Sequence, residues 1–352
     1  MLYIIIAILM FGVLIAVHEF GHFATAKLLG VKVNEFAIGM GPKILSKQGK
    51  ETLYSWRLFP VGGYCAMEGE DEDTEDPHSF QKQAAWKKLL ILVAGSFMNF
   101  LAGFLIFLVL FSQVTAFVTP VLTGFLDGFE GQGQQGLMVG DRITKVDGHM
   151  IFMGSDLDLF FSRGGDTLDL EIKRDGRKII LNDFSMPVKE YTTEGETRML
   201  RGVIRERKEA TFLDRVQIAC LNTVDTVRMV WMGLGDLVTG AVGLRDMSGP
   251  IGIVDMIGQV GENAPTTGLA VQNIFSFIAF IAVNLAVMNL LPIPALDGGR
   301  IFFLAVNSIF TFFTRKKLDP KYEGYVNAAG LICLLGLMAV VAVSDVLKLI
   351  GH

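Results

Sequence analysis

The sequence predicts a polytopic α-helical membrane protein with four transmembrane helices and one small, strand-rich domain outside the bilayer. Of the 352 residues, 51% are hydrophobic and only 19% are charged. Four apolar stretches reach the length of about 20 residues that a helix needs to cross a bilayer. Between the second and third stretches, a long segment alternates short apolar runs with turn residues. The net charge of −5 gives no basic surface, so we expect no nucleic-acid partner.

The predicted transmembrane helices cover residues 2–29, 89–111, 274–291 and 328–349. The first has the apolar character of a secretory signal peptide. However, no Lys or Arg precedes its apolar run, no small-residue cleavage pattern follows it, and a His–Glu pair lies in its interior. We therefore expect a permanent helix.

Basic residues are concentrated in two short loops, which predicts the orientation of the chain. They are Lys32, Lys43, Lys47, Lys50, Arg57, Lys82, Lys87 and Lys88 in one loop, and Arg315, Lys316, Lys317 and Lys321 in the other. Loops rich in Lys and Arg stay in the cytoplasm. Both termini and the long segment from about 112 to 272 are therefore expected on the opposite side of the membrane.

The long segment has two parts. Over residues 121–186, Asp–Gly pairs at 147–148 and 175–176 separate alternating apolar runs, which predicts β-hairpins in a small soluble domain. Over 211–242, apolar residues recur at helical spacing with charges between them, which predicts an amphipathic helix on the membrane surface or on the bundle.

The first loop contains glycine-rich but apolar stretches at 36–42, with Gly39 and Gly41, and at 59–64. They predict short β-like segments. Such backbone near a membrane is tolerated only where protein or a water-filled cavity surrounds it.

The residues with the clearest chemistry are His18, Glu19 and His22, inside the first apolar stretch. Histidines four apart share one helix face, so both can bind one Zn²⁺, while Glu19 can take a proton from a zinc-bound water. The alternative is a pair of histidines on an ordinary helix face. Charged groups in an apolar span cost roughly 2.5–3.5 kcal/mol each unless something compensates them, which favours the metal site.

Zinc usually takes three protein ligands, and Asp297 is the other unusual ionisable group near an apolar stretch. Prolines and glycines in 289–299 should break a helix there and line a buried site. The alternative is a surface turn in which Asp297 caps the next helix. Asn289 and Asn284 are candidates for binding a substrate backbone, and interhelical hydrogen bonding is an equal alternative for Asn284.

Other metal-binding residue types have simpler interpretations. His78, His149 and His352 lie in polar contexts and are expected to be exposed. Cys65, Cys220 and Cys333 are far apart without CxxC spacing, which is typical of small buried apolar residues.

Together these motifs resemble site-2 proteases, the intramembrane zinc metalloproteases of the RseP/RasP type. The resemblance rests on residues 18–22, 36–42, 60–64, 248–253 and 289–299, and it covers essentially the whole chain. It implies zinc held by His18, His22 and Asp297, with Glu19 as the base. It also implies a membrane-reentrant β-hairpin near Gly39 and Gly41 whose edge pairs with substrate, and an extracytoplasmic PDZ domain of α+β fold.

The resemblance further implies a multi-pass protein of the bacterial plasma membrane, with the active site toward the cytoplasm. Expected substrates are single-pass membrane proteins, such as anti-sigma factors, or remnant signal peptides. Two departures from the family pattern are Ser96, where relatives have proline, and the entry to the PDZ domain at 128–137, which lacks the usual Ser-Pro-Ala run.

The predicted organisation is membrane core 1–112, PDZ domain 113–205, helical linker 206–270 and membrane core 271–352. Two other functions are possible. A catalytically silent PDZ adaptor would have no need of Glu19, and an ion transporter would usually show internal repeats, which are not visible here.

Overall fold

The computed structural model describes residues 2–70, 74–193, 196–243, 247–316 and 320–350. Lys317 and His352, which the sequence analysis singled out, lie outside the described residues. The chain forms two compact units. One combines Met1–Leu110 with Asn222–His352, and the other is Phe111–Leu221.

The helices of the first unit include the predicted membrane spans. They are α1 (Leu2–Leu28), α2 (Ala85–Ser112), α5 (Pro250–Glu262), α6 (Thr267–Asn289), α7 (Asp297–Thr314) and α8 (Pro320–Ile350), and α4 (Phe212–Thr239) crosses the boundary between the units. Within the described residues, four helices are long and apolar enough to cross a membrane: α1, α2, α6 and α8. The four predicted apolar helices are therefore confirmed, as is the presence of a helix within 211–242.

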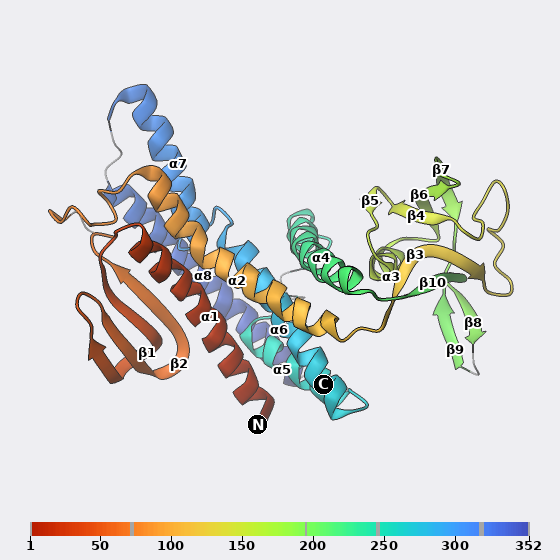
Figure 1. The fold of residues 1–352 in the computed structure, drawn as a ribbon, viewed down its shortest axis with the longest axis horizontal. Coiled ribbons are helices and arrows are strands. Elements are labelled where there is room, and N and C mark those ends of the chain that lie inside the picture. Colours follow the sequence, from red (N-terminus) through yellow and green to blue (C-terminus); the bar gives the residue numbers. More distant parts are fainter. Residues whose placement is uncertain (1, 71–73, 194–195, 244–246, 317–319, 351–352) are drawn as a thin grey trace. The chain divides into compact units, whose positions relative to one another are not determined.

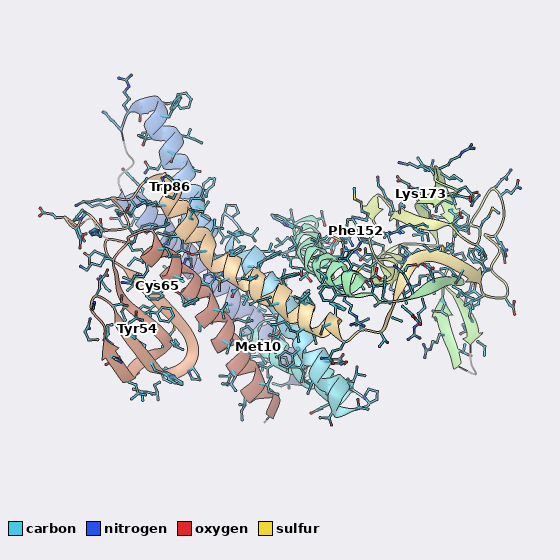
Figure 2. The ribbon with its side chains drawn as sticks, viewed as in Figure 1. Met10, Tyr54, Cys65, Trp86, Phe152 and Lys173 are labelled. Carbon is cyan, nitrogen blue, oxygen red and sulfur yellow. The ribbon has the colours of Figure 1, made fainter. Side chains whose placement is uncertain are left out.

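The helices approach closely where small residues permit it (Figure 1). A Cβ atom on Gly21 of α1 would lie 2.4 Å from the carbonyl oxygen of Ala94 on α2. A Cβ on Gly103 of α2 would lie 2.6 Å from Val283 on α6. Close backbone approach at small residues is how helices pack in lipid, where no hydrophobic effect drives them together. An apolar cluster that includes Met10 of α1, labelled in Figure 2, joins α1 to Ile257 of α5 and Ile281 of α6.

Helix α5 is held at its start by a residue far away in sequence. The buried carboxylate of Asp345 on α8 accepts hydrogen bonds from the backbone N–H groups of Gly249 and Gly252, both at 2.9 Å. These N–H groups belong to the start of α5, where backbone N–H groups have no acceptor within their own helix. The carboxylate therefore acts as an N-terminal cap supplied by another helix. The sequence analysis did not predict α5.

The first loop folds into a two-stranded sheet of β1 (Val33–Gln48) and β2 (Leu53–Met67) (Figure 1). These strands have 16 and 15 residues, so the expectation of short β-like stretches was wrong about their length. Each of the residues Glu35–Ile38 has partners in both halves of β2, so β2 bends around the start of β1. Gly39 and Gly41 lie at the bend with φ values of +85° and +86°, which favour glycine.

The second unit contains a small sheet with strand order β10-β3-β4-β6-β7. Its elements are β3 (Ala116–Phe125), β4 (Arg142–Val146), β5 (His149–Met150), α3 (Gly154–Arg163), β6 (Thr167–Arg174), β7 (Arg177–Ser185) and β10 (Val203–Glu209), and β8 (Lys189–Thr193) pairs separately with β9 (Glu196–Leu200). The core between the sheet and α3 includes Leu122, Ile143, Leu157 and Ile172, all fully buried.

The two predicted Asp–Gly hairpins are confirmed. Asp147–Gly148 joins β4 to β5, with φ values of +47° and +79°. Asp175–Gly176 joins β6 to β7, with φ values of +47° and +81°. Positive φ at both central residues is the signature of the two-residue turn that matches the twist of paired strands.

The simple interpretations of the cysteines and remaining histidines hold only in part. His78 and His149 are exposed, as expected. All three cysteines are free, but Cys65 alone is buried, so the expectation of burial was wrong for Cys220 and Cys333. Both lie on helices, Cys220 on α4 and Cys333 on α8.

Candidate metal centre

The two histidines of the motif converge because α1 runs through them without interruption. His18 and His22 are one turn apart, and their Nε2 atoms lie 3.1 Å from each other. The Nδ1–H group of His22 donates a hydrogen bond to the backbone carbonyl of Ile91 on α2, at 2.8 Å. This bond assigns the proton to Nδ1 and leaves the Nε2 lone pair free for a ligand.

Asp297 completes the group from the other end of the chain. Its Oδ2 atom lies 3.1 Å from Nε2 of His18 and 3.3 Å from Nε2 of His22. Prolines at 292 and 294 end α6 at Asn289, and α7 begins at Asp297. The helix's N-cap is Leu296, and no side-chain capping bond forms there within the described residues. The alternative that Asp297 caps α7 was therefore wrong.

The three ligand atoms fit a zinc ion. Asp297 Oδ2 is buried, and it has no hydrogen-bond donor among the residues that the structure describes. A buried carboxylate oxygen beside the free Nε2 lone pair of His22 is unfavourable unless a cation lies between them. Ligands of a tetrahedral zinc at about 2.0–2.1 Å lie roughly 3.3 Å apart. The observed separations of 3.1–3.3 Å match that spacing.

Glu19 lies beside this group without belonging to it. The backbone of Cys65 on β2 lies beside its carboxylate. A Cβ atom on Gly63 of the same strand would lie 3.5 Å from Cγ of Glu19. Strand β2 therefore packs directly against the turn of α1 that bears the motif.

Gly95 of α2 faces the histidine rings, a role that the sequence analysis missed. A Cβ atom there would lie 2.3 Å from Nε2 of His22 and 2.7 Å from Cε1 of His18. Any larger side chain would occupy the space of the ligands. The available signal was a glycine in the middle of an apolar helix, where glycine costs about 1 kcal/mol relative to alanine.

A cavity of about 640 Å³ opens beside the three ligand residues and Glu19. Its other lining residues are polar and apolar in similar numbers and come from β1, β2 and its exit loop, α2 and the start of α7: Asn34, Tyr64, Cys65, Ala66, Met67, Glu68, Gly69, Glu70, Thr74, Leu92, Ala295, Leu296 and Arg300. A partly polar cavity of this size admits water and an extended peptide. Glu70 and Arg300 were also missed, because neither belongs to a recognisable motif.

The four predicted substrate-binding residues have different positions. The amide nitrogen of Asn289 lies 3.5 Å from Nδ1 of His18, so Asn289 is next to the metal centre. Asn284 is half-buried on α6, five residues earlier and so on another face of that helix. Gly39 and Gly41 lie at the bend of β1, where they contact Phe59 of β2. All four are outside the described lining of the cavity, and their contact with substrate stays a prediction.

Comparison with known proteins agrees with this geometry. The model of Peptidase family M50 matches residues 6–337. A protein of Clostridium acetobutylicum named as a zinc metalloprotease is 36% identical over 347 residues, which cover 97% of both chains. One of Clostridium perfringens with the same description is 34% identical over 98% of this chain and 99% of its own. The regulator of sigma-W protease RasP of Bacillus subtilis is 28% identical over 98% of both chains.

The family match covers nearly the whole chain, and relatives above 30% identity align from end to end. With four helices able to cross a membrane, the protein is a membrane protein. It belongs to peptidase family M50, and it is a zinc metalloprotease.

Proposed function

We propose that this protein hydrolyses peptide bonds within the transmembrane segments of single-pass membrane proteins. The observation that carries the proposal is the convergence of His18, His22 and Asp297 at 3.1–3.3 Å on an apolar helix long enough to span a membrane. Buried ionisable groups on such a helix are costly, and a metal centre that acts inside the membrane accounts for them.

In the proposed mechanism, His18, His22 and Asp297 hold the zinc ion. When bound, zinc supplies a water of lowered pKa and a Lewis acid for the peptide carbonyl. Glu19 takes the proton from the attacking water as the new carbon–oxygen bond forms. Glu19 then donates that proton to the amine nitrogen as the carbon–nitrogen bond breaks. The amide of Asn289 orients the ring of His18, and Asn284, Gly39 and Gly41 contact the substrate backbone.

The unit Phe111–Leu221 is proposed to be a PDZ domain that limits substrate size. Its sheet and single α3 helix support this assignment. Two arginines of the β9–β10 region bridge to α3. Arg205 bonds to Gly154 and Asp158, and Arg201 bonds to the carbonyl groups at the end of the helix. These contacts tie β10 and the β9–β10 turn to α3.

The proposed orientation places the basic loops and the active site toward the cytoplasm of a bacterial cell. The termini and the PDZ domain are then extracytoplasmic. The similarity to RasP supports an anti-sigma factor as one substrate class, with remnant signal peptides as another.

The test compares the purified wild type with a Glu19→Gln variant in detergent. Zinc content is measured by atomic absorption, and cleavage of a tagged single-pass substrate is followed on gels. We expect equal zinc content but no cleavage by the variant. Glu51→Gln is the matched control, because Glu51 is 44% exposed and pairs only with Lys27 among the described residues. Equal cleavage by all three proteins would contradict the proposed role of Glu19.

A further inference from the structure

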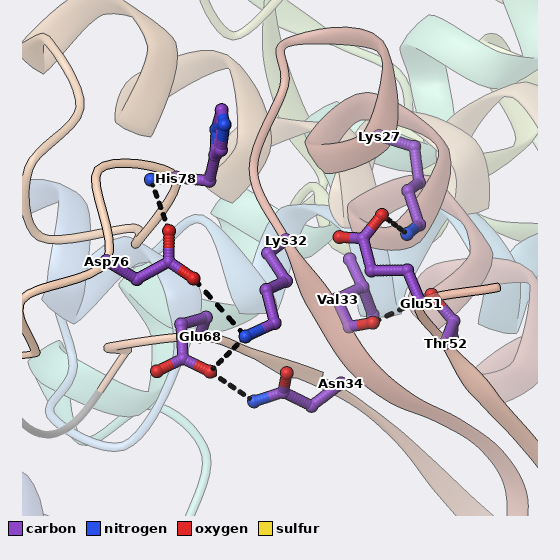
Figure 3. Close-up of polar contacts among 9 residues, drawn as sticks. All are labelled: Lys27, Lys32, Val33, Asn34, Glu51, Thr52, Glu68, Asp76 and His78. Atoms are coloured by element: carbon purple, nitrogen blue, oxygen red, sulfur yellow. Dashed lines mark hydrogen bonds and ion pairs between the residues drawn. The ribbon is translucent and has the colours of Figure 1, made fainter.

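The segment that follows β2 is held in place by a network of polar contacts (Figure 3). Lys32 pairs with Glu68 at 3.3 Å and with Asp76 at 3.2 Å, and Asn34 donates to Glu68 at 2.9 Å. The backbone N–H of Glu68 also donates to the carbonyl of Lys32, at 2.9 Å. The exit of β2 is therefore a defined structure on which the next residues can be positioned.

Glu70 extends from this exit to α7. Its carboxylate accepts a hydrogen bond from the backbone N–H of Met67 at 3.3 Å, and its own carbonyl accepts one from Gln81 at 3.1 Å. The other carboxylate oxygen forms an ion pair with Nη1 of Arg300, 230 positions away in sequence. The two side chains are only 19% and 27% exposed, so water screens this pair less than a surface pair.

Arg300 lies on the first turn of α7, three residues after Asp297. Residues three apart are neighbours on one side of a helix. Within the described part of the chain this turn has no side-chain cap. Gly298 and Gly299 pack against the preceding loop so tightly that a Cβ atom on either would lie within 2.4 Å of a backbone atom. The glycines allow the close approach, and the N–H of Gly299 donates to the N-cap carbonyl of Leu296 at 3.0 Å, a bond within the first turn of α7 that ties it to no distant segment.

We infer that the Arg300–Glu70 ion pair is a positioning device for the metal centre. It sets the rotation of the first turn of α7, and so aims the carboxylate of Asp297 at the two histidines. Through β2 the same pair is connected to Gly63, which packs against Glu19. It thus fixes the proposed third ligand and the proposed base relative to each other. This inference rests on the proposed function.

The position of the pair between two cavities agrees with this role. Glu70, Arg300 and Leu92 line both the 640 Å³ cavity at the metal centre and a second cavity of about 110 Å³ toward Asn307 and Asn327. Both ends of the ion pair are attached to secondary structure, Glu70 to the exit of β2 and Arg300 to α7. An ordinary surface ion pair would have no such attachment.

The test measures zinc affinity directly, by competition between the purified full-length protein and a chromophoric chelator. We expect Arg300→Ala and Glu70→Ala each to weaken zinc binding at least about 10-fold, because partners that orient metal ligands typically contribute 10- to 100-fold to affinity. The double variant should bind no more weakly than either single variant, since the two residues act as one unit. Arg300→Lys keeps the charge and should restore most of the affinity.

The control is Glu51→Gln, which removes the Lys27–Glu51 ion pair on the other side of the hairpin and should leave zinc affinity unchanged. If wild type binds zinc and Arg300→Ala binds it equally well, the positioning role is wrong while the proposed function stands. If the loss of zinc affinity in the double variant equals the product of the losses in the two single variants, the residues act independently and the inference is also wrong. A wild type that binds no zinc would instead refute the proposed function.

Discussion

Replacing Gly95 by alanine should damage the metal centre far more than it damages the fold. The new Cβ atom would lie 2.3 Å from Nε2 of His22 and 2.7 Å from Cε1 of His18. Ordinary contacts of this kind are about 3.4 Å or longer, so the His22 ring must move by roughly 1 Å. A displacement of that size at a reacting group costs on the order of 10²-fold in rate.

The effect on stability should be much smaller. Overpacking typically costs 1–3 kcal/mol, whereas alanine in place of glycine within a helix returns about 1 kcal/mol. We therefore expect the free energy of unfolding to fall by about 2 kcal/mol at most, while cleavage falls about 100-fold and zinc binding weakens.

The assay combines substrate cleavage, chelator competition and thermal unfolding in one detergent. Gly336→Ala on α8 is the matched control, because in the described part of the chain no atom lies within 4 Å of the position where its Cβ would be. Cleavage and zinc affinity at wild-type levels in Gly95→Ala would refute the assigned contact between α2 and the histidines.

Three further predictions test other parts of the structure. Asp297→Asn should lose most zinc binding, measured by equilibrium dialysis, while the helical circular dichroism is retained; retained binding would exclude Asp297 as a ligand. Hydrogen bonds from the side chain and backbone of Thr211, with the charge of Lys208, lower the pKa of Asp214 to about 2. The unfolded value is near 3.9, so this contribution to the start of α4 is complete above about pH 4 and is lost as the pH falls through 2. Hydrogen exchange of α4 against pH should show the loss, and Asp214→Asn should abolish the dependence. Asp345→Ala should lower the free energy of local opening at the start of α5 by about 1 kcal/mol, the usual cost of a lost helix cap. Hydrogen exchange should measure this as faster exchange at the start of α5, with no change in unit Phe111–Leu221.

Features that depend on local sequence were predictable. The four spans follow from apolar length, and the turns at Asp147–Gly148 and Asp175–Gly176 follow from residues that tolerate positive φ. The proximity of Asp297 to the histidines was predicted because two histidines leave a zinc ion short of ligands.

Features that depend on distant partners were not predictable from the sequence. Strand β10 carries charges at most positions, so it lacks the apolar alternation of a strand, and its pairing with β3 defines it instead. The bend of β1 and β2 arises from double pairing at Glu35–Ile38, which no local pattern encodes. The Arg300–Glu70 ion pair joins residues whose proximity exists only after both α7 and the exit of β2 have formed.

The hydrogen bond from His22 to the carbonyl of Ile91 has a consequence for mutational tolerance. Its acceptor is part of the backbone, so substitution of the Ile91 side chain leaves the acceptor in place. Because Ile91 is itself fully buried, substitution there should lower the free energy of unfolding while it leaves this acceptor in place. Substitutions at Gly21 and Gly95, which set the separation of the two helices, should instead displace the His22 ring. The orientation of His22 thus depends on Gly21 and Gly95, which let α1 and α2 approach closely, although neither glycine bonds to His22.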